Sequence, residues 1–509
     1  MIGKIINCKR KGTILTVVFL FLLSGYCGAM QMNNFVPTLP GDSITESIDD
    51  ITLAISKLAI ETSIDEIPDS AFMAAKAALL DALGCAFAGN NGTGVKEIIE
   101  LSEAWGGRKE ASIWFDRIKV PVTEAAFVNS VQLHAMDYDD YHPPSDTHIT
   151  AILVPTVFAM GELNNSSGEE VLAALIVGTE IIGRLGRAYK SRRVHAGFLP
   201  TTVIGGFGAT AAACRLNNCS VDETVNALGI WYAHASGNRQ ALFDRTLTKR
   251  IQPGIAAKAS VFASHLACLG ITGPVRIIGE QPASLMEIYG CDDESNPLSI
   301  EEIMFEDDEW QIEQLHYKCY ACCGYSDIAI KTAIDLAARY EIKPHQIKSI
   351  RLFGDDINSP FAGVLWEDSY TPQVLAQFCV TYATASAIKN KRYGPEEISL
   401  QRIALDRDVD SLARRIQICQ WEEWNGPKPE ASFAMKVYLN DGRTLIQTSE
   451  SYDRYIWPQD YCSLKKKFKE NVGFSGMIKD SRIEELINSI ETIESYTNIQ
   501  NFIKDWLRN

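Results

Sequence analysis

Long segments that are apolar on nearly every side constrain the fold most. Residues 171–182 and 256–269 carry apolar side chains around almost the whole circumference of a helix. A helix of this kind is stable only when other helices surround it, so it belongs in the middle of a bundle. Three helix starts carry a capping box, a serine followed three residues later by glutamate: Ser167, Ser220 and Ser299. We therefore expect a large helical domain over residues 46–310.

The pattern changes after Trp310. Strand-like runs occupy 349–353, 434–439 and 444–448, and helix-like runs occupy 328–340 and 372–389. The last two strands flank Asp441-Gly442, which favours a tight primed turn and so predicts a β-hairpin. We expect a smaller α+β domain over 311–455 and helices over 456–509 that return to the first domain. The predicted fold class is mainly α, with the smaller domain inserted before the C-terminal helices.

The first thirty residues differ from the rest of the chain. Four cations precede an apolar run over 13–23, and a stretch of small residues follows it up to Ala29. This order predicts a signal peptide over 1–29 and hence a secreted or periplasmic protein. The apolar run is too short to span a membrane, so we expect no stable membrane insertion after cleavage. The alternative is an uncleaved N-terminal segment that anchors the protein.

The net charge limits the partners. The chain has a formal charge of −16, and cleavage of the signal peptide would make it more negative. Nucleic acid and anionic membranes are therefore disfavoured as partners. A small acidic substrate is still possible, because a few cations in a closed pocket outweigh a distant surface field. The thirteen cysteines are spread over a large chain, and we expect most of them to be buried free thiols.

The richest group of proton-moving side chains lies between Asp137 and His148. Four carboxylates and two imidazoles fall within these twelve residues, and Pro143-Pro144 stiffens the backbone. This combination is typical of an enzyme site. An EF-hand is excluded, because His142 and His148 stand where glycine and glutamate would be needed. A zinc site that uses both histidines and an aspartate, and a solvated acidic loop, are the alternatives.

Two further motifs have competing interpretations. Residues 203–211 contain a GxGxxA run, but a capped helix follows it, so small residues that let helices approach are favoured over a dinucleotide fold. Residues 318–326 contain a CxxC pair without a thioredoxin-like context, which favours a structural turn. Lys318 and Tyr320 in this turn are candidate substrate contacts.

A third motif places positive charge near a helix start. Lys249 and Arg250 precede Pro253-Gly254 and a buried helix, at a loop-to-helix junction where backbone N–H groups also favour anions. Carboxylates would bind well there. The alternative is a solvated surface pair.

In this order the motifs resemble the MmgE/PrpD family over about residues 59–335, and more weakly to the C-terminus. The matching segments are 80–84, 134–140, 148, 178–180, 197–201, 248–254 and 318–320. The resemblance implies a large helical domain, a smaller α+β lid domain, a homodimer, and a cleft between the domains that needs no metal or other cofactor. Members act on di- or tricarboxylates by breaking a bond beside a carboxylate.

The resemblance also implies roles for individual residues. Asp137, His148 and Lys249 carry over by position as catalytic groups. The candidate substrate contacts are Arg250, His195, Lys318, Tyr320 and Tyr141. Our leading hypothesis is an exported lyase in which Lys249 and Arg250 hold carboxylates. His148, oriented by Asp137 or a neighbour, moves the proton at the reacting carbon in a dehydration or a decarboxylation.

The chain departs from the family pattern at two positions. Leu199 precedes Pro200 where members usually have histidine, and His195 substitutes for it only if the loop is rearranged. Asp327 stands where members often have histidine. Both changes favour one alternative, a catalytically impaired, secreted carboxylate-binding homologue. An epimerase or isomerase of a dicarboxylate is the other alternative.

Overall fold

The computed structural model describes residues 50–191, 197–279, 282–289, 309–425, 429–449 and 460–508. The signal peptide predicted over 1–29, the capping box at Ser299 and the candidate contact His195 lie outside these ranges. Their assignments stay predictions.

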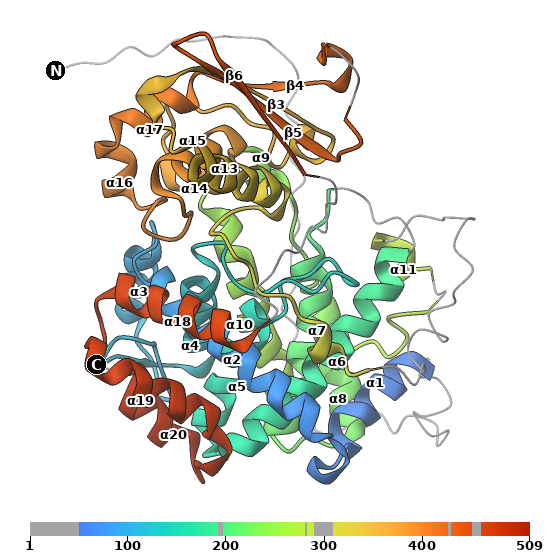
Figure 1. The fold of residues 1–509 in the computed structure, drawn as a ribbon. Helices are drawn as coiled ribbons and strands as arrows, with labels where there is room; N and C mark the ends of the chain where they lie inside the picture. Colours follow the sequence, from blue (N-terminus) through green and yellow to red (C-terminus); the bar gives the residue numbers. More distant parts are fainter. Residues whose placement is uncertain are drawn as a thin grey trace, which may run out of the picture. The chain divides into compact units, whose positions relative to one another are not determined.

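The first part of the described chain is helical (Figure 1). Its helices are α1 (Asp50–Glu61), α2 (Asp69–Gly89), α3 (Val95–Trp105), α4 (Val122–His134), α5 (Thr150–Asn164), α6 (Gly168–Ser191), α7 (Pro200–Leu216), α8 (Val221–Tyr232), α9 (Gln240–Phe243), α10 (Thr248–Cys268) and α11 (Leu285–Tyr289). Between α3 and α4, β1 (Ala111–Ser112) and β2 (Lys119–Val120) pair antiparallel. The sequence did not predict this ribbon, because two-residue strands are too short to show an alternating pattern.

Helices α5, α7 and α10 contact one another, and α4, α6 and α8 pack around them. The GxGxxA run lies inside α7, so the helix-packing interpretation is confirmed and a dinucleotide fold is excluded. A side chain at Gly208 would come within 2.3 Å of the carbonyl oxygen of Gly178 in α6, and one at Gly206 would overlap the ring of Trp231 in α8. The small residues therefore allow the close approach that this core requires.

Two of the predicted capping boxes are present. The backbone N–H of Glu170 donates to the Ser167 hydroxyl, and the Glu170 carboxylate accepts from Ser167. Ser220 and Glu223 form the same reciprocal pair at the start of α8. Both boxes satisfy N–H groups that a helix start otherwise leaves without a partner.

A disulfide joins the N-terminal end of α8 to the C-terminal end of α10, between Cys219 and Cys268. Eight other cysteines within the described ranges are free, and five of them are buried. The interpretation of most cysteines as buried free thiols therefore fits the described part of the chain.

The smaller domain combines helices with one sheet (Figure 1). Its elements are α13 (Asp327–Tyr340), β3 (Ile347–Gly354), α14 (Pro372–Gln377), α15 (Val380–Asn390), α16 (Leu400–Leu405), α17 (Arg407–Ala413), β4 (Ile416–Cys419), β5 (Phe433–Leu439) and β6 (Thr444–Ser449). The strand order is β4-β3-β5-β6, with β3 and β4 parallel and the other pairs antiparallel. The predicted hairpin is β5–β6, and the fold class, mainly α with a smaller α+β domain, is confirmed.

One predicted helix is two helices. The run over 372–389 breaks between α14 and α15, where Phe378 and Cys379 leave helical backbone angles. The single-helix prediction was wrong because apolar spacing alone does not reveal a tertiary break. The break lets the Phe378 ring face the cavity described below.

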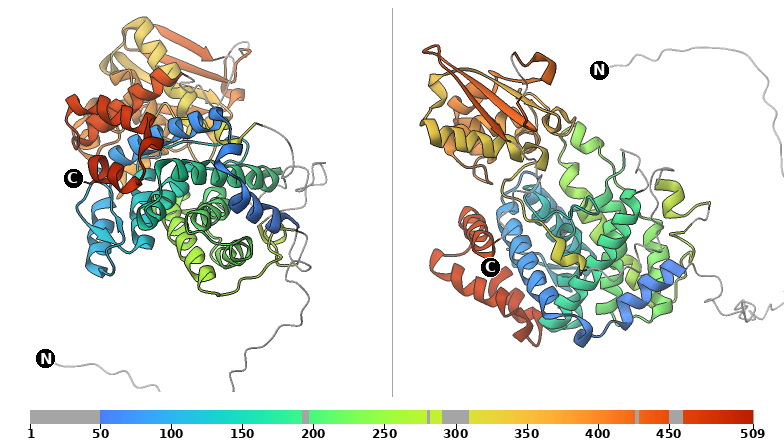
Figure 2. Two further views of the ribbon diagram at one scale, coloured as in Figure 1. Left: turned by 90° about the horizontal axis from the view of Figure 1, so that it is seen from below. Right: turned by 45° about the vertical axis from the view of Figure 1, so that its right-hand side comes forward.

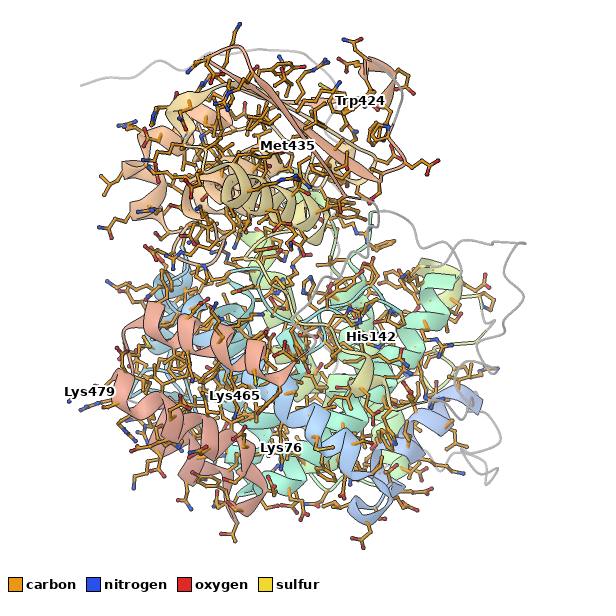
Figure 3. All side chains as sticks on the ribbon, in the orientation of Figure 1. Lys76, His142, Trp424, Met435, Lys465 and Lys479 are labelled. Carbon is orange, nitrogen blue, oxygen red and sulfur yellow. A yellow bond between two sulfur atoms is a disulfide. The ribbon has the colours of Figure 1, made fainter. Side chains whose placement is uncertain are left out.

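The sheet separates two apolar layers. Met435 and Val437 on β5 pack with the helices of the smaller domain, whereas Ala434 packs on the opposite face with Trp424. Figure 3 labels Met435 and Trp424 on these two faces. Alternate residues of a strand point to opposite sides, so one strand serves both layers.

The C-terminal helices return to the helical domain. Figures 1 and 2 show α18 (Tyr461–Ser475), α19 (Asp480–Glu491) and α20 (Ile499–Phe502) beside the first helices of the chain. Helices α18 and α19 contact α2, and α20 contacts α5. A buried ion pair crosses this contact, with Lys467 Nζ 2.6 Å from Asp81 Oδ1.

Helix α2 is long and apolar enough to cross a membrane, and it is the single helix in the described ranges that passes this test. However, 72% of its most apolar window is buried by the rest of the protein. Its apolar character is therefore explained by its place in the helical core.

Candidate active site

The acidic cluster predicted from the sequence forms the connection between α4 and α5. Two short bridges shape it. Tyr141 and His316 exchange backbone hydrogen bonds of 2.8 and 2.9 Å, and the His142 N–H donates to the Thr147 carbonyl across the Pro143-Pro144 turn. The first bridge carries Lys318, two residues after His316, to the position of Asp137. Segments that are far apart in the chain therefore meet at this loop.

Asp137 lies between two lysines. Its carboxylate accepts from Lys249 Nζ on one side and from Lys318 Nζ at 3.1 Å on the other. Its backbone has φ of 52°, in the left-handed region that aspartate tolerates better than most residues. Lys318 also donates to the carbonyls of Asp137 and Cys322, so its three N–H groups are all used. Counted by itself, this trio carries one excess positive charge, which the nearby Asp139 carboxylate offsets.

Burial and pairing shift the pKa values in this trio. Burial alone would raise the pKa of Asp137, but the two lysines hold it well below its usual range. Burial lowers the pKa of Lys249, and the attraction of Asp137 raises it by a smaller amount. The nearby Lys318 charge lowers it further. The pKa of Lys318 is raised, because Asp137 and Asp139 outweigh its burial. Lys249 is therefore the more easily deprotonated of the two lysines.

A histidine pair shares a second carboxylate. The Asp139 oxygens lie 2.9 and 3.0 Å from Nδ1 of His134, and Oδ2 lies 3.3 Å from Nδ1 of His148. Asp139 is ionised, since the two imidazoles hold its pKa well below normal in spite of burial. Burial lowers the pKa of His134 to about 4, so this ring is neutral near pH 7. We infer that its proton is on Nδ1, facing Asp139, while Nε2 accepts from Lys249 Nζ at 2.6 Å.

His148 is the more accessible of the two rings. Its side chain is 16% exposed, whereas that of His134 is 1% exposed, and the rings meet edge to face at 5.0 Å. The His148 backbone N–H donates to the hydroxyl of Thr201 in the first turn of α7. This bond ties His148 to the segment that contains Leu199.

One cavity collects these groups. It has about 130 Å³ of space that the centre of a water molecule can reach. His148, Lys249, Asp137, Lys318 and Tyr141 all line it. The smaller domain closes the opposite side with Cys323, Gly324, Tyr325, Phe361 and Phe378. An imidazole and an ammonium that are about a hundred residues apart in sequence therefore face the same space.

Two predicted substrate contacts lie elsewhere. Lys249 and Arg250 are in the first turn of α10 rather than in a loop before it, and successive residues of a helix point about 100° apart. Arg250 therefore turns away from the cavity and donates to the Thr93 carbonyl and to the amide oxygens of Gln373 and Gln377. Tyr320 does not line the cavity either.

Several cavity residues escaped the sequence analysis. His134 stands in the same motif as Asp137, but a single histidine at the end of a helical run gave no signal of its own. Arg239 lines the cavity, with one guanidinium nitrogen 3.0 Å from Asp146 Oδ2, and Tyr141 donates its hydroxyl proton to Asp146. The lining residues of the smaller domain lie too far along the chain for any local pattern to reveal them.

A metal ion would find one suitable group of ligands in the described part of the chain. Nitrogen and oxygen atoms of His134, Asp139 and His148 lie within 4.8 Å of one another. Among the described residues His142 belongs to no such group, so the zinc site suggested with His142 gains no support. A second group contains Cys219 and Cys268, whose sulfurs are joined in the disulfide and offer no thiolate.

Comparisons with known proteins show the family of the chain. Residues 53–294 match the MmgE/PrpD N-terminal domain, and residues 320–492 match the MmgE/PrpD C-terminal domain. A cis-aconitate decarboxylase-like protein of Aspergillus oryzae is 24% identical, over 89% of this chain and 96% of that protein. The cis-aconitate decarboxylase of Aspergillus terreus is 23% identical, over 88% and 94%. The human cis-aconitate decarboxylase is 27% identical, over 89% and 92%. With both of its domains matched, the chain belongs to the MmgE/PrpD enzyme family.

Proposed function

We propose that the protein is a lyase that decarboxylates a small unsaturated di- or tricarboxylate of the cis-aconitate type, without a metal. One observation carries the proposal: His148 and Lys249 line a single cavity with a net positive trio around Asp137. The names of the relatives support the same reaction class. Dehydration of the corresponding hydroxy acid uses the same groups and is the alternative chemistry.

Substrate binding rests on Lys249 in this proposal. Within the part of the chain that the structure describes, its ammonium group donates to Asp137 and His134, which leaves one N–H for a ligand. A carboxylate placed there would also meet the net positive charge of the trio. Positive charge held in a buried site stabilises the negative charge that develops as the reaction proceeds.

Proton transfer rests on His148. Asp139 is ionised and its Oδ2 lies 3.3 Å from Nδ1 of His148, so the carboxylate orients a ring that can deliver a proton to a ligand in the cavity. In the decarboxylation, the bond between carbon and one carboxylate breaks and CO₂ leaves. The electron pair stays in the conjugated system of the substrate, and the proton from His148 forms the new C–H bond. Solvent then reprotonates the imidazole.

The experiment is turnover of cis-aconitate followed by NMR. His148→Gln should lower kcat by roughly a hundredfold to ten-thousandfold, which is the usual contribution of a positioned acid or base. His345→Gln is the matched control, because His345 lies exposed in the smaller domain. Unchanged turnover in His148→Gln would remove this ring from the mechanism. We expect the protein to keep its activity after dialysis against a chelator. If the activity is lost and added Zn²⁺ restores it, a metal at His134, Asp139 and His148 is favoured instead.

A second candidate function is carboxylate binding without turnover. Leu199 lines the cavity, and a leucine side chain transfers no proton. Calorimetric binding of cis-aconitate to the wild-type protein, with no product in a long NMR incubation, would select this candidate. Solvent deuterium in recovered substrate would select an epimerase instead.

We also propose that the protein is exported. The disulfide between Cys219 and Cys268 supports this, since disulfides persist mainly in oxidising compartments. N-terminal sequencing of protein from the medium or periplasm should find a start just after Ala29. An intact Met1 in the mature protein would favour the anchored alternative. A homodimer stays a proposal that light scattering can test.

A further inference from the structure

The two imidazoles of the candidate site converge on one oxygen atom. Asp139 Oδ2 lies 2.9 Å from Nδ1 of His134 and 3.3 Å from Nδ1 of His148. The three donor groups lie within 4.8 Å of one another. Ligand atoms around a tetrahedral zinc ion are roughly 3.3–3.5 Å apart, because each lies about 2.0–2.2 Å from the metal. Small side-chain movements therefore give this trio the spacing of three zinc ligands.

One of these donor atoms lacks a hydrogen bond. His148 Nδ1 is buried and has no hydrogen-bond partner among the described residues, although Asp139 Oδ2 is only 3.3 Å away. A buried polar atom without a partner needs an explanation, and a bound ion is one. His134 and His148 both line the cavity, so a metal ion can reach the trio from there. A water molecule on the cavity side can fill the fourth position.

The donor set selects the kind of cation. Two imidazole nitrogens and one carboxylate oxygen suit Zn²⁺, whereas Mg²⁺ and Ca²⁺ prefer oxygen ligands. The ammonium group of Lys249 lies 2.6 Å from Nε2 of His134, and its positive charge opposes a second cation. Zn²⁺ therefore binds less tightly here than in a structural zinc site, and its binding can be reversed.

We propose that His134, Asp139 and His148 form an inhibitory Zn²⁺ site, through which the cation switches off the proposed lyase. This inference rests on the proposed function. Zn²⁺ takes the place of the proton on Nδ1 of His134, and this proton leaves to solvent. Nε2 then takes a proton from Lys249, so the imidazole stays neutral and the lysine loses the charge that binds the substrate. The metal also fixes His148, whose ring no longer delivers its proton.

The first experiment is calorimetric titration of Zn²⁺ into the full-length protein after dialysis against a chelator, with no organic acid present. His134→Gln and His148→Gln should each weaken binding by roughly a hundredfold or more, since even the outer partners of metal ligands contribute roughly tenfold to a hundredfold. His345→Gln, at an exposed position, and Cys323→Ser, which removes a thiol from the same cavity, are the controls and should leave the affinity unchanged. Equal affinity in the wild type and both cavity-histidine variants, or loss of binding in Cys323→Ser, overturns the assignment.

A spectrum of the wild-type protein tests the ligands without any substitution. Co²⁺ in place of Zn²⁺ should show the visible bands of a tetrahedral site with nitrogen and oxygen ligands. The intense near-ultraviolet band of cobalt bound to thiolate should be absent. Its presence would place the metal on cysteine and overturn the assignment.

Turnover of cis-aconitate, measured by NMR, separates this inference from the proposed function. Free Zn²⁺ at about ten times its dissociation constant should lower turnover about tenfold, by mass action, and the same concentration of Mg²⁺ should not. Turnover that Zn²⁺ leaves unchanged overturns the inference and keeps the lyase. Turnover that requires Zn²⁺ overturns both the inhibition and the metal-free lyase. If neither condition gives turnover, the lyase fails, and calorimetry by itself supports or overturns the zinc site.

Discussion

Two buried aspartate–lysine groups flank the same loop, and they differ in access to the cavity and in the number of lysines. Asp137 is shared by Lys249 and Lys318, and all three line the cavity. Asp81 is paired with Lys467 on the other side of the loop, away from the cavity, where the Lys467 ammonium also donates to the Tyr138 carbonyl at 2.7 Å. All five side chains are less than 10% exposed.

The comparison teaches that burial alone does not identify a functional ion pair. Asp81 and Lys467 balance each other, so the pair is neutral and holds α18 against α2. The group around Asp137 instead faces an open space, and the nearby Asp139 carboxylate offsets the charge of its second lysine. Titratable groups with shifted pKa values that line a cavity are candidates for a functional site, which marks the cavity group as the functional one.

The largest expected effect comes from removing the cavity-facing cation. Lys249→Met should lower turnover of the substrate by roughly a hundredfold or more, because the developing negative charge loses its partner. Its effect on stability should be smaller, since Lys318 still pairs with Asp137. Turnover by NMR and urea unfolding measure the two effects. A large loss of stability with normal turnover per folded molecule would reverse the roles assigned to the two groups.

The second prediction concerns the neutral pair. Lys467→Met leaves the Asp81 carboxylate buried without a partner and should lower the free energy of unfolding by about 3–5 kcal/mol. Turnover per folded molecule should stay near that of the wild type. The double variant Asp81→Asn/Lys467→Met should recover much of the stability, measured by urea unfolding. If the double variant is no more stable than the single one, the pair acts through its other contacts, such as that with Tyr138.

The third prediction uses pH. His134 has a pKa of about 4 in the folded protein and 6.5 ordinarily, so the unfolded chain takes up a proton first as pH falls. Stability from this group is complete above about pH 6.5 and is lost as pH falls toward 4, by about 2 kcal/mol between pH 7 and pH 5. The lowered pKa of Asp137 acts at lower pH, below its ordinary value of 3.8. Unfolding at pH 7 and pH 5 should therefore show a smaller difference in His134→Gln than in the wild type.

The smallest effect is expected at an exposed pair of the same chemistry. Lys331 and Asp335 lie one helical turn apart on α13, with side chains 42% and 50% exposed. Lys331→Met should change the free energy of unfolding by less than about 0.5 kcal/mol and leave turnover unchanged. A larger change would show that exposed and buried ion pairs in this protein contribute similarly to stability, which would contradict the comparison.

Much of the fold followed from local patterns. The helix at 328–340, the hairpin at 434–448 and the capping boxes at Ser167 and Ser220 depend on side chains within a few residues of each other, and the structure contains them all. The break at Phe378 was missed, because it depends on contacts made by residues distant in the chain. The bounds of the domains stay predictions.

The sequence predicted only some of the residues of the candidate site. Asp137, His148 and Lys249 were proposed from the motifs, and the structure brings them to one cavity. The motifs could not separate Lys249 from Arg250, because adjacent positions in a sequence point in different directions only after a helix has formed. His134 was missed for a similar reason, since its contact with Lys249 joins α4 to α10.

The sequence by itself determined which segments become helices and strands, and which short stretch carries the acids and bases, since periodicity, capping and turn chemistry act over a few residues. Only the tertiary structure decided which of those groups share a cavity and which cations are already paired. These properties depend on distances between residues hundreds of positions apart, and burial then sets the charge that each group carries.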